Sequence, residues 1–157
     1  MQRCRLTKGY ENLIRRLRMI KRISLVSVAS VLLLSHAVLA STPSPQGARA
    51  YIISPVDGET VSTPVKIQFG LQGMGVAPAG VDKAKTGHHH LLIDTDAPIM
   101  DKPIPKDDKH KHFGGGQTEV VLNLKPGRHT LQLLLGDKGH MPHSPAVMSE
   151  KITIIVK

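Results

Sequence analysis

The sequence predicts an all-β fold, a single antiparallel β-sandwich of about seven short strands. Short apolar runs alternate with polar residues at a period of two, which is typical of strands with one buried face. Clusters of Pro, Gly and Asp separate these runs at the spacing of turns. No stretch after the first 40 residues shows the periodicity of an amphipathic helix. With 157 residues, the chain is long enough for one domain with its own core.

The first expected strand is residues 49–54 (RAYIIS), which end at the turn Pro55-Val56-Asp57-Gly58. A short continuation starts at Val61, and residues 65–71 (VKIQFGL) alternate apolar and polar side chains. This opening resembles the start of many bacterial immunoglobulin-like domains. The sandwich is therefore expected to be immunoglobulin-like.

Residues 72–87 contain four glycines and little periodicity, so they are expected to form a long loop, and loops of this length are often functional. Residues 88–95 form the next expected strand, and residues 96–111 a solvated return segment. The remaining strands are expected at residues 117–124, 129–135 and 147–156, joined by a turn at 125–128 and a loop at 136–145.

Residues 1–40 are predicted to be a signal peptide. Lys21 and Arg22 precede an apolar segment at residues 23–34, and residues 38–40 (VLA) suit cleavage by signal peptidase. The apolar run is shorter than the ~20 residues of a transmembrane helix. The mature protein is therefore expected in the periplasm, and at a membrane only if the segment stays uncleaved.

Two boundaries accompany this prediction. Residues 1–18 are either a long basic n-region or a mis-annotated extension before a true start at Met19. Residues 41–48, rich in Ser, Pro and Gly, are expected to be a flexible linker before the domain at residues 49–157.

The net charge of +9 belongs mainly to the signal segment. Residues 1–40 hold eight Lys or Arg and one acid, whereas the rest of the chain holds thirteen Lys or Arg and eleven acids. The mature domain is thus nearly neutral and has few aromatic residues, so no nucleic-acid partner is predicted. The single cysteine, Cys4, lies in the signal segment, so the mature domain has no disulfide and no thiolate.

Three groups of histidines stand out in the mature domain. His88, His89 and His90 open the expected strand at 88–95, and the other two groups are His110 with His112 and His140 with His143. In an immunoglobulin-like order, the third strand starts, the fifth starts and the sixth ends at the same end of the domain. The three groups are therefore expected to meet there, close to Gly114-Gly115-Gly116, which would let the backbone pass near the rings.

The local spacing suits a transition metal. In an extended chain residues i and i+2 share a face about 6.6 Å apart, so two alternate histidines can bind one ion while the middle one points away. Neutral imidazoles bind Cu or Zn, and a methionine thioether favours Cu(I). The candidate metal ligands are His88, His89, His90, His110, His112, His140 and His143, with Met141, Met74, Asp94 and Asp137 as accessory candidates. His129, by contrast, is expected to hydrogen-bond backbone at a strand corner.

Three segments, GHHHLLIDTD, HFGGGQTEVVLNLKPGRHTLQLLLGD and HMPHSPAVMSEKITI, closely resemble a bacterial family of exported domains of unknown function. The resemblance spans Ala48 to Lys157. Some members carry the label of rod-shape-determining proteins, which nothing in this sequence supports. The resemblance implies that the histidine motifs recur in the family, and it implies no activity.

These observations favour a periplasmic metal-binding module, with copper preferred to zinc, in storage, delivery or protection. Its partners would be the ion and another periplasmic metal-handling or envelope protein. A metal-dependent enzyme with a histidine-bound Cu or Zn centre is the first alternative, although no catalytic residue is predicted. The second is an envelope interaction or assembly module that responds to pH through its histidines.

Overall fold

The computed structural model describes residues 41–157, so the predicted signal peptide at residues 1–40 lies outside the described residues. The described chain contains strands and no helix. The strands are β1 (Arg49–Ser54), β2 (Thr60–Val61), β3 (Val65–Gln72), β4 (Gly75–Val76), β5 (Thr86–Ile93), β6 (His110–His112), β7 (Glu119–Leu122), β8 (Gly127–Gly136) and β9 (Ile152–Val156).

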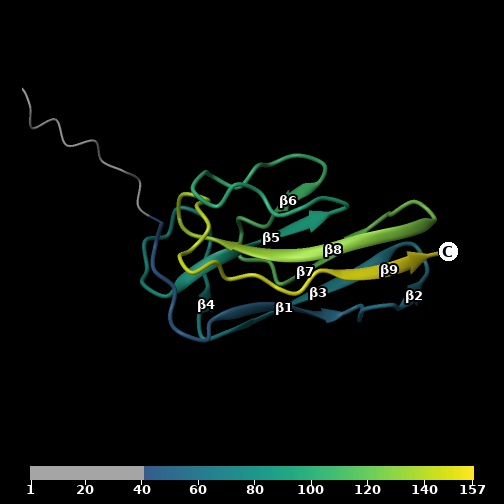
Figure 1. The fold of residues 1–157 in the computed structure, drawn as a ribbon, viewed down its shortest axis with the longest axis horizontal. Coiled ribbons are helices and arrows are strands. Elements are labelled where there is room, and N and C mark those ends of the chain that lie inside the picture. Colours follow the sequence, from purple (N-terminus) through teal and green to yellow (C-terminus); the bar gives the residue numbers. More distant parts are fainter. Residues whose placement is uncertain (1–40) are drawn as a thin grey trace, which may run out of the picture. The chain divides into compact units, whose positions relative to one another are not determined.

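The strands form two sheets, which confirms the predicted all-β sandwich (Figure 1). One sheet has the order β1-β3-β7, and the other has the order β2-β9-β8-β5-β4, with β6 also paired to β5. Most pairings are antiparallel, but β2 runs parallel to β9 and β4 runs parallel to β5. These two short parallel pairs differ from the expected wholly antiparallel arrangement, because the chain reaches each of them through a crossing segment and not through a hairpin.

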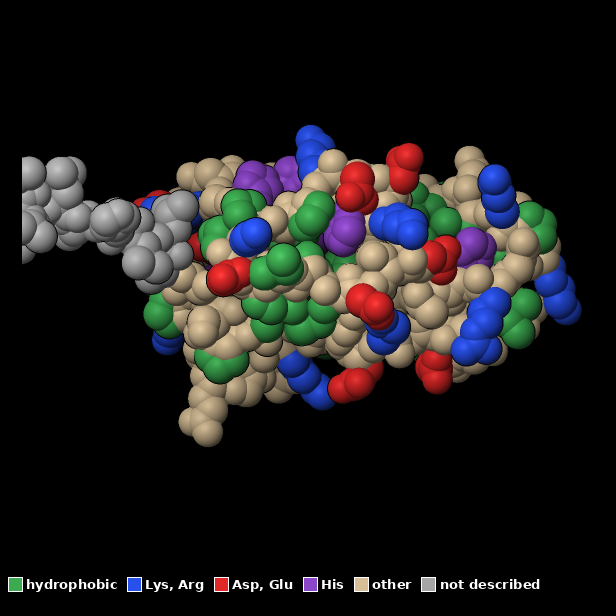
Figure 2. All heavy atoms as spheres, turned by 45° about the horizontal axis from the view of Figure 1, so that its top comes forward, with side chains coloured by type: hydrophobic (Ala, Val, Ile, Leu, Met, Phe, Trp, Pro, Cys, Tyr) green, Lys and Arg blue, Asp and Glu red, His purple; other side chains and the backbone are tan. Residues whose placement is uncertain are grey.

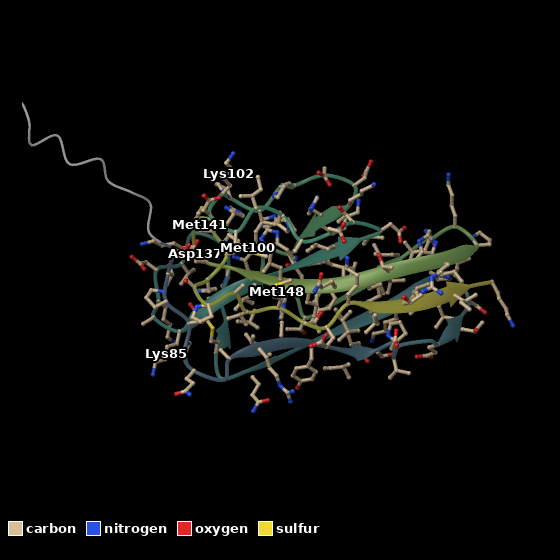
Figure 3. All side chains as sticks on the ribbon, viewed as in Figure 1. Lys85, Met100, Lys102, Asp137, Met141 and Met148 are labelled. Atoms are coloured by element: carbon tan, nitrogen blue, oxygen red, sulfur yellow. The ribbon has the colours of Figure 1, made fainter. Side chains whose placement is uncertain are left out.

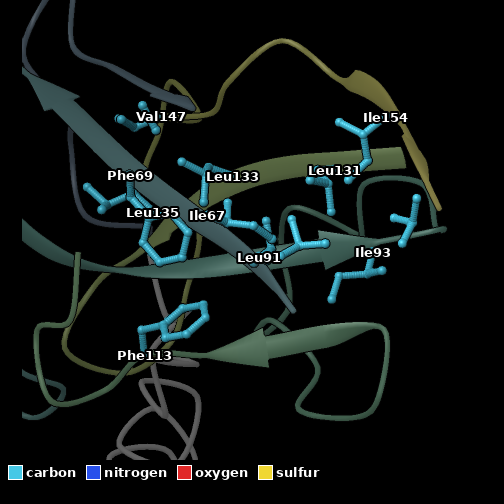
Figure 4. Close-up of a cluster of buried hydrophobic side chains, with 13 residues drawn as sticks. Ile67, Phe69, Leu91, Ile93, Phe113, Leu131, Leu133, Leu135, Val147 and Ile154 are labelled. Carbon is cyan, nitrogen blue, oxygen red and sulfur yellow. The ribbon is translucent and has the colours of Figure 1, made fainter. Parts of the chain in front are cut away.

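The main core lies between the sheets (Figure 4). Leu131, Leu133 and Leu135 of β8 are all fully buried in this core. The aromatic rings of Phe69 and Phe113 pack against each other with centroids 4.8 Å apart. Burial of these side chains supplies the main stabilisation of a domain without disulfides.

A second, smaller apolar cluster covers the outer face of the larger sheet. Leu92, Ile104 and Leu134 are its buried members, and Met100 and Met148 pack against them. Ile104 comes from the segment that was expected to be solvated. Because this segment folds back over the sheet, the central strands β5 and β8 are covered on both faces.

The double covering explains the burial of β5, in which every residue from Gly87 to Ile93 is buried. Successive side chains of a strand point to opposite faces. His89 faces the main core, with its ring 5.3 Å from that of Phe69. His88 and His90 lie on the other face, on the side of the smaller cluster. The sequence alone indicated this alternation, but not that both faces would be buried.

Several element boundaries differ from those expected. The predicted loop at 72–87 contains β4 and the first two residues of β5. The last strand begins at Ile152 and not at residue 147, because Ser149 interrupts the ladder. Its hydroxyl, in place of a backbone carbonyl, accepts the hydrogen bond from the Leu133 N–H.

The residues before β1 are held against the loop that follows β8. The backbone N–H of Ser44 donates to the Ser144 carbonyl, and the Ser144 N–H donates to the Thr42 carbonyl, each at 3.1 Å. The Thr42 side chain also reaches Asp137. Within residues 41–157, no helix is long and apolar enough to span a membrane.

We expect His89→Leu to raise the free energy of unfolding by about 1–2 kcal/mol, because it removes a buried polar ring of similar volume that has no hydrogen-bond partner. Neither ring nitrogen of His89 has a partner in the structure. Chemical denaturation of the metal-free protein would measure the change. A loss of stability would show that the imidazole makes a favourable interaction in the core.

Candidate metal centre

Four imidazole rings meet on the outer face of the larger sheet. His88 and His90 come from β5, His112 comes from β6, and His140 comes from the loop after β8. All pairs of these rings have centroids between 4.7 and 6.0 Å apart. We call these four residues the histidine cluster.

The ring nitrogens of the cluster converge. The Nε2 atoms of His88 and His90 are 3.0 Å apart, and those of His112 and His140 are 3.1 Å apart. His88, His90 and His112 each offer a ligand atom within 4.8 Å of the others. This group of three, of which His88 and His90 are fully buried, can hold a metal ion, and the His140 ring lies against all three.

Strand pairing brings the cluster together. His90 on β5 is directly opposite His112 on β6, and His88 is opposite Gly136 on β8. Paired residues of neighbouring strands direct their side chains to the same face. The cross-strand pair of His90 and His112 is therefore a consequence of register.

Two glycines make room for the rings. A Cβ atom at Gly136 would lie 2.9 Å from Nε2 of His90, and a Cβ atom at Gly114 would collide with the ring of His112. Gly114 belongs to the triplet that was expected to pass close to the histidines. The sequence predicts that Gly136 lies in a loop. The only sequence feature that points to its role beside His90 is its position at the end of a strongly apolar strand.

Asp137 shapes the turn that presents His140. Its Oδ1 accepts hydrogen bonds from the backbone N–H groups of Gly139 and Met141, at 2.8 and 3.0 Å. Its Oδ2 accepts a bond of 2.6 Å from the Thr42 hydroxyl. Burial would raise the pKa of Asp137, but these hydrogen bonds outweigh it and hold the pKa below its usual value. The carboxylate is thus a structural element of the loop that carries His140. Figure 3 shows Asp137 beside Met141 at this end of the domain.

The backbone at His140 adopts an unusual conformation, with φ at 66°. A residue other than glycine in the left-handed region is strained unless its surroundings hold it. Here the His140 N–H donates to the Asp137 carbonyl, and the His140 carbonyl accepts from Ile104 of the covering segment. The two contacts direct the ring toward the cluster.

The inner members of the cluster are electrically neutral at physiological pH. Burial lowers the pKa of His88 to about 4, with further contributions from His140 and His112. Burial lowers the pKa of His90 to about 3, assisted by His88 and His112. The pKa of His112 is also lowered, by burial and then by the charges of His140 and Lys106. Neutral imidazoles are the form that binds metals.

The other predicted ligands lie outside the cluster. His89 faces the main core, because neighbouring residues in a strand point to opposite faces. His110 lies two residues before His112 on β6, opposite Leu92 of β5, and its Nδ1 is 2.9 Å from the Asp107 carboxylate. His143 is buried, its Nδ1 lies 3.1 Å from the Thr42 carbonyl, and its Nε2 has no partner.

The remaining accessory candidates also lie elsewhere. Asp94 is at the opposite end of β5, where it accepts a hydrogen bond from the Thr130 N–H and pairs with the His129 ring at 2.7 Å. His129 also bonds the Lys125 carbonyl, as predicted for a strand corner. Met74 packs against the main core. Met141 is buried, and its backbone closes a turn with Asp137.

The cluster reaches solvent through its outer members. His88 and His90 have no exposed surface, whereas His112 and His140 are partly exposed. Histidine side chains are visible at the molecular surface in Figure 2. The described histidines that can contribute to that surface are His110, His112, His129 and His140. An ion would therefore enter from the side of β6 and the loop after β8.

Fold and site together define an all-β domain with a cluster of four histidines, two of which are fully buried. The chain belongs to the DUF4399 family, a domain of unknown function that matches residues 67–157. The match runs from β3 to the C-terminus and includes the whole cluster, and it agrees with the expectation of an uncharacterised family. No curated protein and no solved structure shows significant similarity to the chain.

We expect Gly114→Ala to displace His112 and to lower the free energy of unfolding by about 1–3 kcal/mol, because the new methyl group would overlap its ring. Nitrogen NMR of the histidine rings would report the displacement, and chemical denaturation the stability. Gly115→Ala is the matched control, because its methyl group would meet only the flexible side chain of Gln117. Equal effects of the two changes would contradict this assignment.

We expect the metal-free protein to lose stability as the pH falls from about 6.5 toward 4. The pKa values of His88 and His90 are about 4 and 3 in the folded protein, compared with 6.5 for a free imidazole. In this window the unfolded chain takes up protons that the folded chain excludes, so protonation favours unfolding. Above this window, both states are neutral and the contribution disappears.

Denaturation midpoints measured between pH 7 and pH 4.5 would check this expectation. The double variant His88→Gln/His90→Gln should show a shallower decline than the unmodified protein, because neither new side chain titrates. An unchanged slope would assign the acid sensitivity to other groups.

Proposed function

We propose that the mature domain is a periplasmic module that binds one transition metal ion through the histidine cluster. Copper is preferred to zinc, and the role is storage, delivery or protection. The observation that carries this proposal is the convergence of several uncharged imidazole nitrogens at a buried point. If the cluster bound no ligand, burying polar rings against one another would contribute little to the stability of the domain.

The nitrogen separations support a metal. Four ligands at bonds of 2.0–2.1 Å in a tetrahedron lie about 3.3 Å from each other. The two measured Nε2 separations, 3.0 and 3.1 Å, are close to this value. Small movements of the rings would thus complete a four-nitrogen site, with His140 as the fourth ligand.

The preference for copper follows from ligand chemistry. A site of imidazoles binds Cu(II) more tightly than Zn(II), and no thiolate is present in residues 41–157 to favour zinc. Neutral ligands leave the charge of the ion uncompensated. The Asp137 carboxylate supplies negative charge nearby. Its charge raises the pKa of His88 and so opposes the effect of burial on that pKa. The same field favours a bound cation.

Binding is a better account than catalysis, because the nearby carboxylates are already engaged. Asp137 accepts three hydrogen bonds in its loop. Asp107 accepts from the His110 ring and from two backbone N–H groups. Neither is free to act as the acid or base that hydrolysis at a metal requires.

We expect the purified mature domain to bind one equivalent of Cu(II) with a dissociation constant below about 1 μM, and Zn(II) more weakly. His112→Gln should weaken Cu(II) binding by at least about 100-fold, because it removes a ligand. Calorimetric titration would measure both values. His110→Gln is the matched control, since His110 is on the same strand, is also partly exposed, and lies outside the cluster. It should change the affinity by less than about threefold.

Elemental analysis of the protein isolated from its native compartment would identify the ion it carries. If neither Cu(II) nor Zn(II) binds below about 1 μM, or if His110→Gln weakens binding as much as His112→Gln, the proposed site is wrong.

A further inference from the structure

A second binding feature adjoins the histidine cluster. A groove of about 390 Å³ opens where the edge strand β6 of one sheet faces the edge strand β7 of the other. Its lining includes Lys106, Lys111, His112, Phe113, Val120 and Leu122. Its volume is within the range of small-molecule sites, which is about 300–1,000 Å³.

The floor of the groove is apolar because it reaches the main core. Phe113 is a buried core residue, and Val120 and Leu122 of β7 pack against the same cluster while remaining partly exposed. β6 and β7 are not hydrogen-bonded to each other. The sandwich is therefore open along this edge, and part of its core surface can be covered by an apolar ligand.

Three charged side chains line the groove, the cations Lys106 and Lys111 and the carboxylate Asp107. The Asp107 carboxylate accepts hydrogen bonds from the His110 ring and from the backbone N–H groups of Lys109 and His110. Lys111 pairs with the exposed Asp108 at 3.1 Å. Lys106 makes no ion pair with any residue in the described part of the chain, 41–157.

Lys106 lines the groove together with Phe113, Val120 and Leu122, so a cationic side chain and the apolar floor border the same groove. An uncompensated cation beside an apolar floor is complementary to an anion with an apolar body.

We propose that this groove binds a small carboxylate with an aliphatic chain, in the manner of a medium-chain fatty acid. The chain would cover Phe113, Val120 and Leu122, and the carboxylate would pair with Lys106 and Lys111. Nothing in this inference requires a metal ion, so it stands apart from the proposed metal site.

The test uses the complete mature domain after treatment with chelator, so that metal binding does not contribute. Titrations of the isotope-labelled protein with octanoate, 1-octanol and octylammonium would be followed by NMR. We expect octanoate to shift the signals of Phe113, Val120 and Leu122, and to bind at least about tenfold more tightly than the other two.

Lys106→Gln should weaken octanoate binding by about three- to tenfold and leave 1-octanol binding unchanged. Lys109→Gln is the matched control, because Lys109 is exposed in the same segment but does not line the groove. Equal binding of octanoate and 1-octanol would overturn the proposal, as would shifts confined to another surface or equal effects of the two lysine substitutions.

Discussion

The arrangement of the site depends on the register of β5. This strand pairs with β8 on one side and with β6 on the other, and both pairings fix which residues face outward. A shift of one residue would move His88 and His90 into the main core and bring His89 out. The apolar residues that follow resist such a shift, because Leu91 and Ile93 belong to the main core and Leu92 to the smaller one. Burial of Leu91, Leu92 and Ile93 on the two faces of β5 therefore fixes the positions of the histidines that precede these residues.

The cluster nevertheless imposes a cost on the fold. A neutral imidazole has one N–H, so the close pair of His88 and His90 can share only one hydrogen bond through Nε2. The donor ring then keeps an acceptor at Nδ1, and the acceptor ring keeps an N–H there, and both Nδ1 atoms lack partners. An unsatisfied buried polar group costs about 1–3 kcal/mol. A core that served stability alone would not need such residues, and this cost favours a ligand as the reason for them.

The sequence predicts this site in part. Alternation along a strand separates His89 from its neighbours, and the order of strands in a sandwich brings the three histidine groups to one end. The sequence does not show which of His110 and His112 joins the cluster, because residues two apart in a strand share a face. Only the pairing of β6 with β5 places His112 opposite His90. That pairing depends on β6, which lies between a charged segment and glycines and carries no clear strand pattern.

The carboxylates show a second limit of sequence reasoning. Asp94 follows the histidines by a few residues, yet β5 carries it to the far end, where it pairs with His129. Asp137 precedes His140 by three residues, yet its oxygens are occupied by its own loop and by Thr42. In both cases proximity in sequence suggests a ligand, whereas the direction of the chain and the local hydrogen bonds determine what the carboxylate contacts. A glycine such as Gly136 is harder still to recognise, because its role is to leave space.

His112 belongs to the cluster and also lines the neighbouring groove, which couples the two electrostatically. The Lys106 ammonium group disfavours positive charge at His112, since it lowers the pKa of that ring. The same charge opposes a metal cation there. An anion held at Lys106 would offset this repulsion and make the cluster a better site for a cation. Because binding free energies are linked, a cation in the cluster would favour the anion by the same factor. Lys106, which binds the anion and by itself opposes the cation, would thus make the two ligands cooperative.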